Sequence, residues 1–235
     1  MMTLQDVFTE LALGELSSLF SSVLGSGRID ETREPQVTHY VNSGLLRLYS
    51  RFCMYEKEAI IDLLDHRTDY PLLPRHALTQ QGQPGAGETY IRDSQDEPFI
   101  QDVLRVLSVT TDTGKLLPLN DPGVEEAAFT PRPDMVQIPC VERYNAVSVI
   151  YQAAHPKLSH ERPEEEILLP VQLQPALNAW VAYKAYSGVG TMEANAKAKE
   201  HHDIYQTLCN EVEQLDLVSA SRSVTTCKFE KNGWV

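Results

Sequence analysis

The chain has few of the features that place a sequence in a common functional class. Its four cysteines form no CxxC pair and have no regular spacing, so they predict neither a disulfide scaffold nor a cysteine zinc site. No apolar run is long enough to cross a bilayer, and the first ten residues carry no basic stretch of the signal-peptide type. We therefore expect a soluble protein that is not exported and makes no membrane contact.

Positive charge is also scarce. The 235 residues include 20 Lys and Arg against 33 Asp and Glu, which gives a formal net charge of −13. A protein that binds nucleic acid on its own needs an excess of Lys and Arg to neutralise phosphates, so this class is disfavoured. Apolar residues make up 42% of the chain, which is enough for a substantial core. The composition therefore indicates a folded, acidic protein.

No stretch carries a convincing catalytic motif. The glycine-rich segments 82–87 and 188–190 lack the lysine and hydroxyl residue of a phosphate loop, and no serine lies in a GxSxG motif. His201 and His202 are adjacent on an expected helix and point about 100° apart, which disfavours a shared metal ion. We expect no catalytic residue, cofactor or metal. A small metal-dependent hydrolase that uses this histidine pair and the glutamates 164–166 is kept as an alternative.

Residues 1–54 predict two helices. Thr3 and Asp6 have the spacing of a capping box, and apolar residues follow at helical intervals as far as Val23. A second helix is indicated by another start signal, which is followed by another apolar face. Either Asp30 or Thr32, followed by Pro35, marks the start of this second helix, and Leu45, Leu48 and Phe52 are expected in the core.

Residues 167–217 predict a helical hairpin. Apolar residues recur at three- and four-residue steps in two runs, and Gly188 and Gly190 separate the runs. Many alanines in both runs would allow close helix approach, either inside one subunit or across a subunit interface. The expected core positions are Leu177, Trp180 and Val181 in the first run and Tyr205, Leu208 and Val212 in the second.

Residues 55–166 predict a β-rich unit inserted between the two helix pairs. Between Phe99 and Tyr151 the apolar period changes to two and β-branched residues concentrate, which indicates at least four strands. The segment from Tyr55 to Leu73 fits either a helix or a strand, and we favour a strand. Residues 80–98 are rich in Gly, Pro, Gln and acidic residues, so we expect an exposed, mobile loop there.

The expected fold is therefore α+β: an antiparallel helical bundle of about four helices with an inserted antiparallel β-unit. Residues 218–235 are polar until they reach two aromatic side chains, so we expect an extended C-terminal arm. Aromatic side chains on such an arm bury a large apolar area when they dock on another subunit. The docking residues would be Phe229, Trp234 and Val235.

Several short stretches occur along the chain in a recognisable order. They are LLRLYSRF at 45–52 running into EKE at 56–58, YPLLP at 70–74, VSVIY at 147–151, LLP at 168–170 and LNAWVAYKAY at 177–186, followed by the helix from 194 to 205. This pattern covers most of the chain and resembles the head-to-tail adaptor, or connector, proteins of tailed bacteriophages, particularly the short-tailed kind. The loop at 80–98 does not align with that pattern.

The resemblance implies a structural virion protein without catalytic residues. Such adaptors form a homo-oligomeric ring, usually twelvefold, that lies under the portal protein, extends the DNA channel and docks tail-tube or nozzle components. Genomic DNA would pass through the lumen without sequence-specific binding, and acidic residues that face the lumen would repel its phosphates. The protein would assemble in the host cytoplasm and act at the head–tail junction of the virion. Another tail-completion or portal-plugging protein of the virion is a second possibility.

Overall fold

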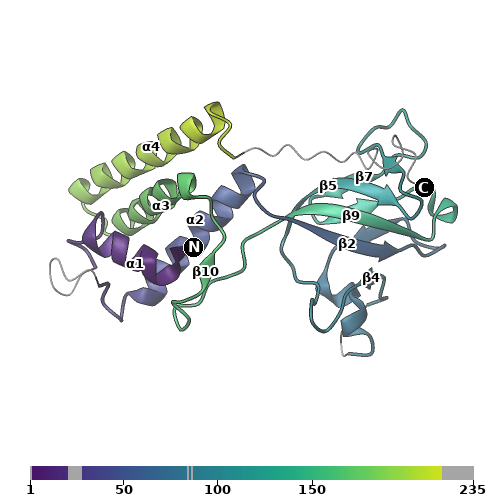
Figure 1. Cartoon of the computed structure of the whole chain (residues 1–235), viewed down its shortest axis with the longest axis horizontal. Coiled ribbons are helices and arrows are strands. Elements are labelled where there is room, and N and C mark those ends of the chain that lie inside the picture. Colours follow the sequence, from purple (N-terminus) through teal and green to yellow (C-terminus); the bar gives the residue numbers. More distant parts are fainter. Residues whose placement is uncertain (1, 21–27, 84, 86, 219–235) are drawn as a thin grey trace, which may run out of the picture.

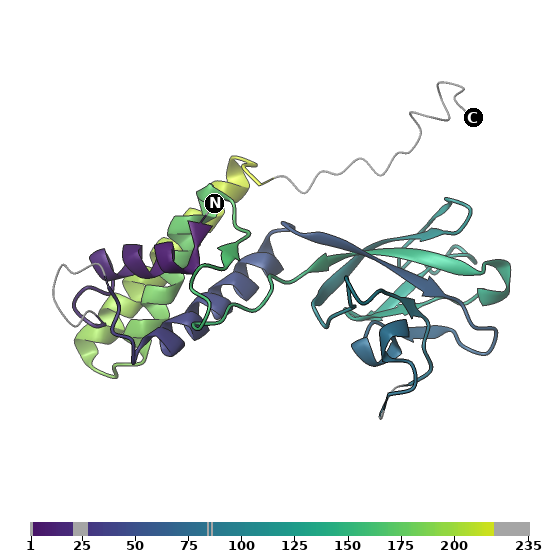
Figure 2. The same ribbon diagram turned by 60° about the horizontal axis from the view of Figure 1, so that its bottom comes forward.

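The computed structural model describes residues 2–20, 28–83, 85 and 87–218, and it separates helices from sheets. The four α-helices lie at one end of the molecule and the larger sheets at the other (Figure 1). A view turned by 60° keeps the two parts apart along the long axis (Figure 2). The predicted α+β class, with about four helices and antiparallel sheets, is confirmed. No helix within the described residues is long and apolar enough to cross a membrane.

Helix α1 (Leu4–Leu13) begins where the sequence predicts and ends earlier. Thr3 caps it, since the Thr3 hydroxyl accepts the Asp6 N–H at 3.2 Å and the Asp6 carboxylate accepts the Thr3 N–H at 2.8 Å. The helix stops at Gly14, because glycine costs about 1 kcal/mol in a helix interior and the chain turns there instead. The expected continuation towards Val23 is therefore wrong from Gly14 to Phe20, and residues 21–27 lie outside the described ranges.

Helix α2 (Glu34–Arg51) follows a turn, and neither Asp30 nor Thr32 caps it. The Asp30 carboxylate accepts the Thr32 N–H at 2.9 Å and the Thr32 hydroxyl at 2.7 Å, so both residues are engaged before the helix starts. Of the predicted start residues only Pro35 lies in the first turn, where its missing N–H costs nothing. The predicted core residues Leu45, Leu48 and Phe52 are buried, and Val37 and Val41 of α2 are buried with them.

Helices α3 (Gln174–Ser187) and α4 (Met192–Gln214) form the predicted hairpin. The Thr191 hydroxyl caps α4 by accepting the Ala194 N–H at 3.2 Å. Helix α3 contacts α4, α2 and α1, so it lies at the centre of the helical core. The predicted core residues Leu45, Leu48, Phe52, Leu177, Val181, Tyr205 and Val212 are buried, whereas Trp180 and Leu208 are half-buried at its margin.

The β-rich unit contains two antiparallel sheets that share one core. The larger has the order β4-β2-β9-β5-β6 and the smaller the order β3-β8-β7. Strand β2 settles the ambiguous segment as a strand, because it pairs with β9 from Glu56 to Asp62. The strands are β2 (Glu56–Asp62), β3 (Asp69–Pro71), β4 (Ile91–Arg92), β5 (Val103–Thr111), β6 (Leu116–Leu117), β7 (Phe129–Arg132), β8 (Met135–Gln137) and β9 (Ala146–Ala153).

The segment 80–98 is not the fully exposed loop that its composition predicts. Within it, Tyr90 and Ile91 are completely buried, and β4 pairs with β2. The Tyr90 ring stacks on His76 at 4.7 Å, and its hydroxyl donates to the Pro71 carbonyl at 2.8 Å. One large aromatic side chain therefore anchors a stretch whose average composition is polar.

Residues after β9 return along the helices. Asn42 of α2 binds the Leu158 backbone twice, with its amide donating to the carbonyl at 3.0 Å and its oxygen accepting the N–H at 2.9 Å. Strand β10 (Glu166–Ile167) then pairs with β1 (Met2–Thr3). Leu158 and Ile167 are buried in the helical core, so the end of the predicted inserted range belongs with the helices.

Replacement of Gly44 tests the closeness of α2 and α3. An added Cβ would lie 2.7 Å from Leu177 Cδ1 and 2.9 Å from Trp180 Cδ1, and the buried Leu177 and the rigid indole have little room to move. Gly44→Ala should lower the free energy of unfolding by about 1–3 kcal/mol through overpacking. The higher helix propensity of alanine offsets about 0.5–1 kcal/mol of this loss. The matched control is Gly188→Ala, whose nearest contact is an ordinary 3.5 Å and which should change stability by under about 0.5 kcal/mol. Urea unfolding measures both, and equal stability of the two variants would contradict the prediction.

Candidate functional site

The α3–α4 hairpin buries one face and exposes the other. Helix α4 packs on α3, and small side chains are buried on both helices, including Ala194 and Ala198 of α4 and Ala179 and Ala182 of α3. Small side chains let two helix backbones come close. The alanines therefore serve the core of one subunit, with the exception of Ala196, which is exposed.

The opposite side of α4 faces solvent and carries a shallow hollow of about 540 Å³. We call it the α4 outer face; it is lined by Ala196, Lys199, Glu200, Asp203, Ile204, Thr207 and Leu208. Ile204 is 42% exposed at its centre, and Met192, at the start of the same helix, is 92% exposed. Apolar side chains ringed by charged ones are typical of a protein contact surface.

Arg51 holds the end of α4 against the end of α2. Its guanidinium donates to both carboxylate oxygens of Glu213, at 2.7 and 2.9 Å, and to the side-chain oxygens of Asn210 at 2.6 Å and Gln206 at 3.1 Å. The hydrogen bond from Arg51 lowers the pKa of Glu213 below its usual range. These charge-assisted hydrogen bonds fix the last turns of α4 against the end of α2.

The histidines of α4 occupy separate aromatic environments. His201 stacks on Tyr186 at 5.4 Å, and His202 meets the edge of Tyr183 at 5.0 Å. Within the described residues, no three His, Cys, Asp or Glu side chains are placed to hold a metal ion. The glutamate run is also engaged locally, since Glu165 pairs with Arg162 at 2.8 Å. The structure therefore does not bring the histidine pair and the glutamates together as one metal site.

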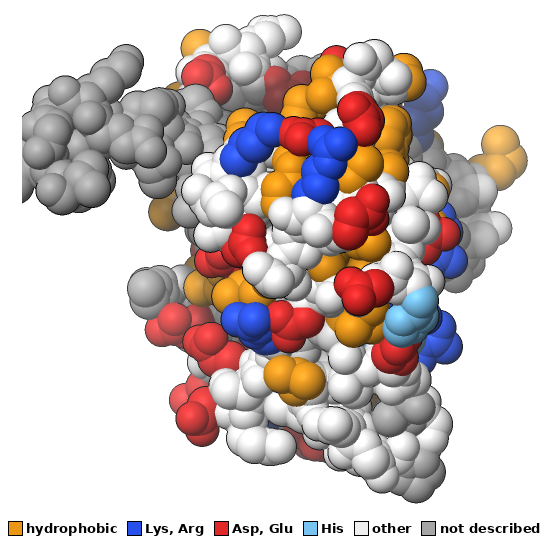
Figure 3. Space-filling model, turned by 90° about the vertical axis from the view of Figure 1, so that its right-hand side faces the viewer, with side chains coloured by type: hydrophobic (Ala, Val, Ile, Leu, Met, Phe, Trp, Pro, Cys, Tyr) orange, Lys and Arg blue, Asp and Glu red, His pale blue; other side chains and the backbone are white. Residues whose placement is uncertain are grey.

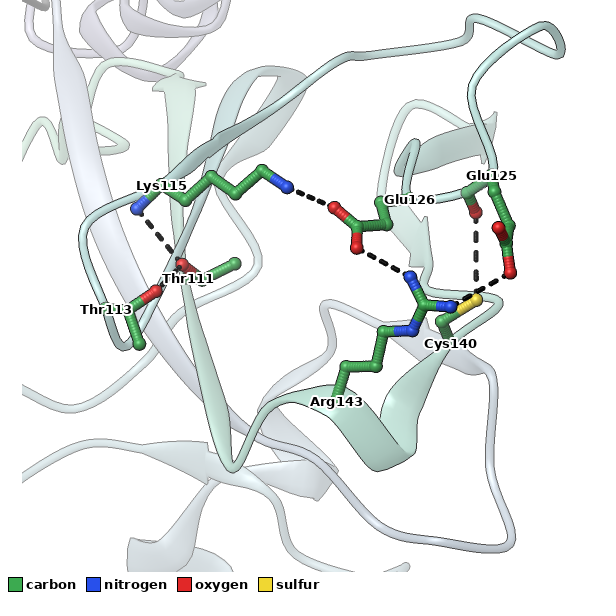
Figure 4. Close-up of polar contacts among 7 residues, drawn as sticks. All are labelled: Thr111, Thr113, Lys115, Glu125, Glu126, Cys140 and Arg143. Carbon is green, nitrogen blue, oxygen red and sulfur yellow. Dashed lines mark hydrogen bonds and ion pairs between the residues drawn. The ribbon is translucent and has the colours of Figure 1, made fainter.

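A network of ion pairs closes the end of the β-unit that lies farthest from the helices. Arg143 donates to Glu126 at 2.6 Å and to Glu125 at 2.9 Å, and Lys115 also pairs with Glu126 (Figure 4). The hydrogen bonds from Lys115 and Arg143 lower the pKa of Glu126. The same end of the molecule shows acidic side chains interspersed with hydrophobic ones (Figure 3). The network joins three loops, and it contains no nucleophile paired with a base.

The junction between helices and sheets contains a cluster of polar contacts around the buried Gln152. Gln152 of β9 is 1% exposed, and its amide donates to the carbonyls of Phe52, at 3.0 Å, and Tyr49. The Tyr49 hydroxyl donates to the Leu168 carbonyl. His155 accepts the Leu168 N–H at 3.0 Å and donates from Nδ1 to the Pro156 carbonyl at 2.6 Å. Both histidine nitrogens are thus used by the neutral ring.

Sequence patterns missed the residues that connect distant segments. Asn42 and Leu158, and Gln152 and Phe52, lie about a hundred positions apart, and no periodicity relates such pairs. The predicted docking residues Phe229, Trp234 and Val235 lie outside the described residues, of which Val218 is the last.

The junction predicts a pH dependence of stability. Burial lowers the pKa of His155, so the unfolded chain binds a proton more readily than the folded one. The contribution of neutral His155 to the free energy of unfolding is fully present above about pH 6.5 and is lost as the pH falls below that value. The free energy of unfolding then changes by at most about 1.4 kcal/mol per pH unit for one proton. His155→Asn should flatten the slope of unfolding free energy between pH 5 and 7, whereas replacing the exposed His160 by Asn should not. Urea unfolding across this range would contradict the prediction if both variants kept the parent slope.

Comparison with known proteins does not assign the chain to a group. No model of a protein family matches it, and no curated protein gives a significant sequence match. The function is therefore argued from the arrangement of its surfaces.

Proposed function

We propose that the chain is a structural adaptor of a tailed-bacteriophage virion, which forms a twelvefold ring under the portal protein. The ring would extend the DNA channel, dock a tail-tube or nozzle protein and act at the head–tail junction after assembly in the host cytoplasm. The order of the short motifs from 45–52 to 177–186 supports this function. The separation of helices and sheets along one axis also suits a subunit that must meet a different partner at each end (Figures 1 and 2).

The observation that carries the proposal is the α4 outer face. The inner side of α4 satisfies the core of its own subunit, so exposed Ile204 and Met192 on the remaining surface are available to a second protein. A ring needs a heterologous interface, in which one surface of a subunit meets a different surface of the next. A long, open helix side is suited to such a contact.

The remaining parts have distinct roles in this proposal. The four helices act as an antiparallel bundle that supports the ring, and the β-unit projects from it. The C-terminal arm, with Phe229, Trp234 and Val235, docks on a neighbouring subunit or the portal. The formal charge of −13 per subunit disfavours adhesion of the DNA backbone to the lumen.

Mass measurements test the ring. Mass photometry of the purified protein, alone and mixed with a portal ring from the same phage genome, should show about twelve copies bound per portal. A protein that stays monomeric and does not bind the portal would refute the proposal. Binding of a single copy at the channel would favour a portal-plugging protein instead.

A single substitution tests the α4 outer face. Ile204→Asp places a charge at the centre of the apolar contact and should weaken ring formation at least about tenfold, because buried apolar anchors dominate interface energies. Its thermal unfolding should match the parent, since Ile204 does not belong to the core. The control is Leu116→Asp, an exposed apolar residue on β6 of the β-unit. Equal assembly of both variants would contradict the role of this face.

A further inference from the structure

Strand β2 has one edge that is only partly paired. On one side β9 pairs with its whole length, but on the other side β4 pairs only with Ile60 and Ile61. The Asp62 N–H donates to the Tyr90 carbonyl at 2.8 Å, so the backbone N–H and C=O of Asp62 face the β4 side of the strand. Alternate residues of a strand point the same way, so the backbone N–H and C=O of Glu58 also point there. No described residue pairs with them.

The edge is open because the chain after β4 is held away from β2. The Asp93 carboxylate accepts the Thr79 N–H at 2.9 Å, the Thr79 hydroxyl at 2.5 Å and the Phe99 N–H at 3.0 Å. Ser94 then begins a turn, in which its N–H donates to the Glu97 carbonyl at 3.4 Å. These contacts direct the segment away at the point where a longer β4 would continue along Glu58.

A groove of about 850 Å³ lies between this edge and the departing segment. Tyr55, Glu58 and Ile60 line it on the β2 side, and Glu97, Phe99 and Ile100 line it on the other. Ile100 is 43% exposed and Ile60 is 38% exposed. An extended chain in the groove would gain backbone hydrogen bonds from the strand edge and apolar contacts from both walls.

The charges of the groove favour a basic occupant. Its two cations already have partners, since Lys57 pairs with Asp102 at 2.5 Å and Arg92 pairs with Asp62 at 2.6 Å. Glu58 and Glu97 remain as acids at its rim, and no cation is paired with either among the described residues.

The chain itself contains a matching segment. Residues 222–229, RSVTTCKF, lie outside the described residues, and they combine three β-branched side chains with Arg222 and Lys228 and contain no glycine or proline. Such a composition favours a strand. At about 3.3 Å per residue it spans roughly 26 Å, more than the open part of β2 requires. It follows the last described residue, Val218, after a three-residue link.

We propose that residues 222–229 of a neighbouring copy add to the open edge of β2 as a strand beside Glu58. This inference rests on the proposed function, because it supplies the heterologous contact that a ring needs. A neighbouring copy is the donor because α4 ends on the upper side of the molecule, whereas β4 lies at the lower edge of the sheet in both views (Figures 1 and 2). The segment of the same chain would have to pass around the junction.

Hydrogen exchange of the full chain tests the added strand. The Glu58 amide should exchange at least about tenfold more slowly in the assembled protein than in dilute monomer, whereas the Ala59 amide, which faces β9, should be protected in both. The double variant Val224→Pro, Thr226→Pro should abolish the Glu58 protection, because proline cannot donate to a ladder. If the Glu58 amide exchanged as slowly in dilute monomer as in the assembled protein, the chain's own segment would be inserted and the proposal would be overturned.

Mixing two variants tests the donor. Glu58→Pro removes the outward N–H and the carboxylate, and the β2–β9 ladder is kept because the Glu58 backbone points away from β9. Glu58→Ala is its control, since it also loses the carboxylate but keeps the N–H at the strand edge. Glu58→Pro and the Val224→Pro, Thr226→Pro variant should each stay monomeric, and together they should form heterodimers in mass photometry, while Glu58→Ala still forms rings. Rings formed by Glu58→Pro would overturn the strand. Wild-type rings that bind the portal with an unprotected Glu58 amide would refute this inference and leave the proposed function standing.

Discussion

The amide of Gln152 is the contact on which the relative position of helices and sheets depends. The last carbonyls of a helix have no partner within it, and those of Tyr49 and Phe52 at the end of α2 receive the Gln152 amide of β9. Because Gln152 is 1% exposed, replacing its amide would leave the buried Tyr49 carbonyl without this donor, whereas the Phe52 carbonyl would keep the Met54 N–H at 3.0 Å. The central strand of the larger sheet is therefore attached directly to the C-terminal end of α2.

Helix α4 and strand β2 each have one side that is covered within the subunit and one side that is open. One side of α4 completes the subunit core through Ala194, Ala198 and Tyr205, and β9 completes one side of β2 along its full length. In each case the second side remains open: a helix face with exposed Ile204, and a strand edge beside Glu58. A subunit whose open surfaces differ in kind is suited to head-to-tail association, because unlike surfaces do not pair with themselves.

Patterns within a few residues were sufficient to predict much of this fold. The two-residue period from 103–111 and 146–153 gave β5 and β9, and the three- and four-residue steps gave the α3–α4 hairpin. The composition of residues 80–98 predicted an exposed loop wrongly, because two buried residues, Tyr90 and Ile91, anchor the segment despite its polar neighbours. The candidate surfaces could not be predicted from local patterns, since the exposure of Ile204 and the pairing of β2 depend on which distant elements cover them.

The interruption of the helical core by the β-unit has a consequence for synthesis on the ribosome. Helices α1 and α2 are made first, but α3, against which both pack, begins at Gln174. The β-unit, from Glu56 to Ala153, is contiguous in sequence and can fold as soon as it emerges. The N-terminal helices must wait with an apolar face open while that unit forms. Nascent chains are therefore most exposed to misassociation before α3 and α4 leave the exit tunnel.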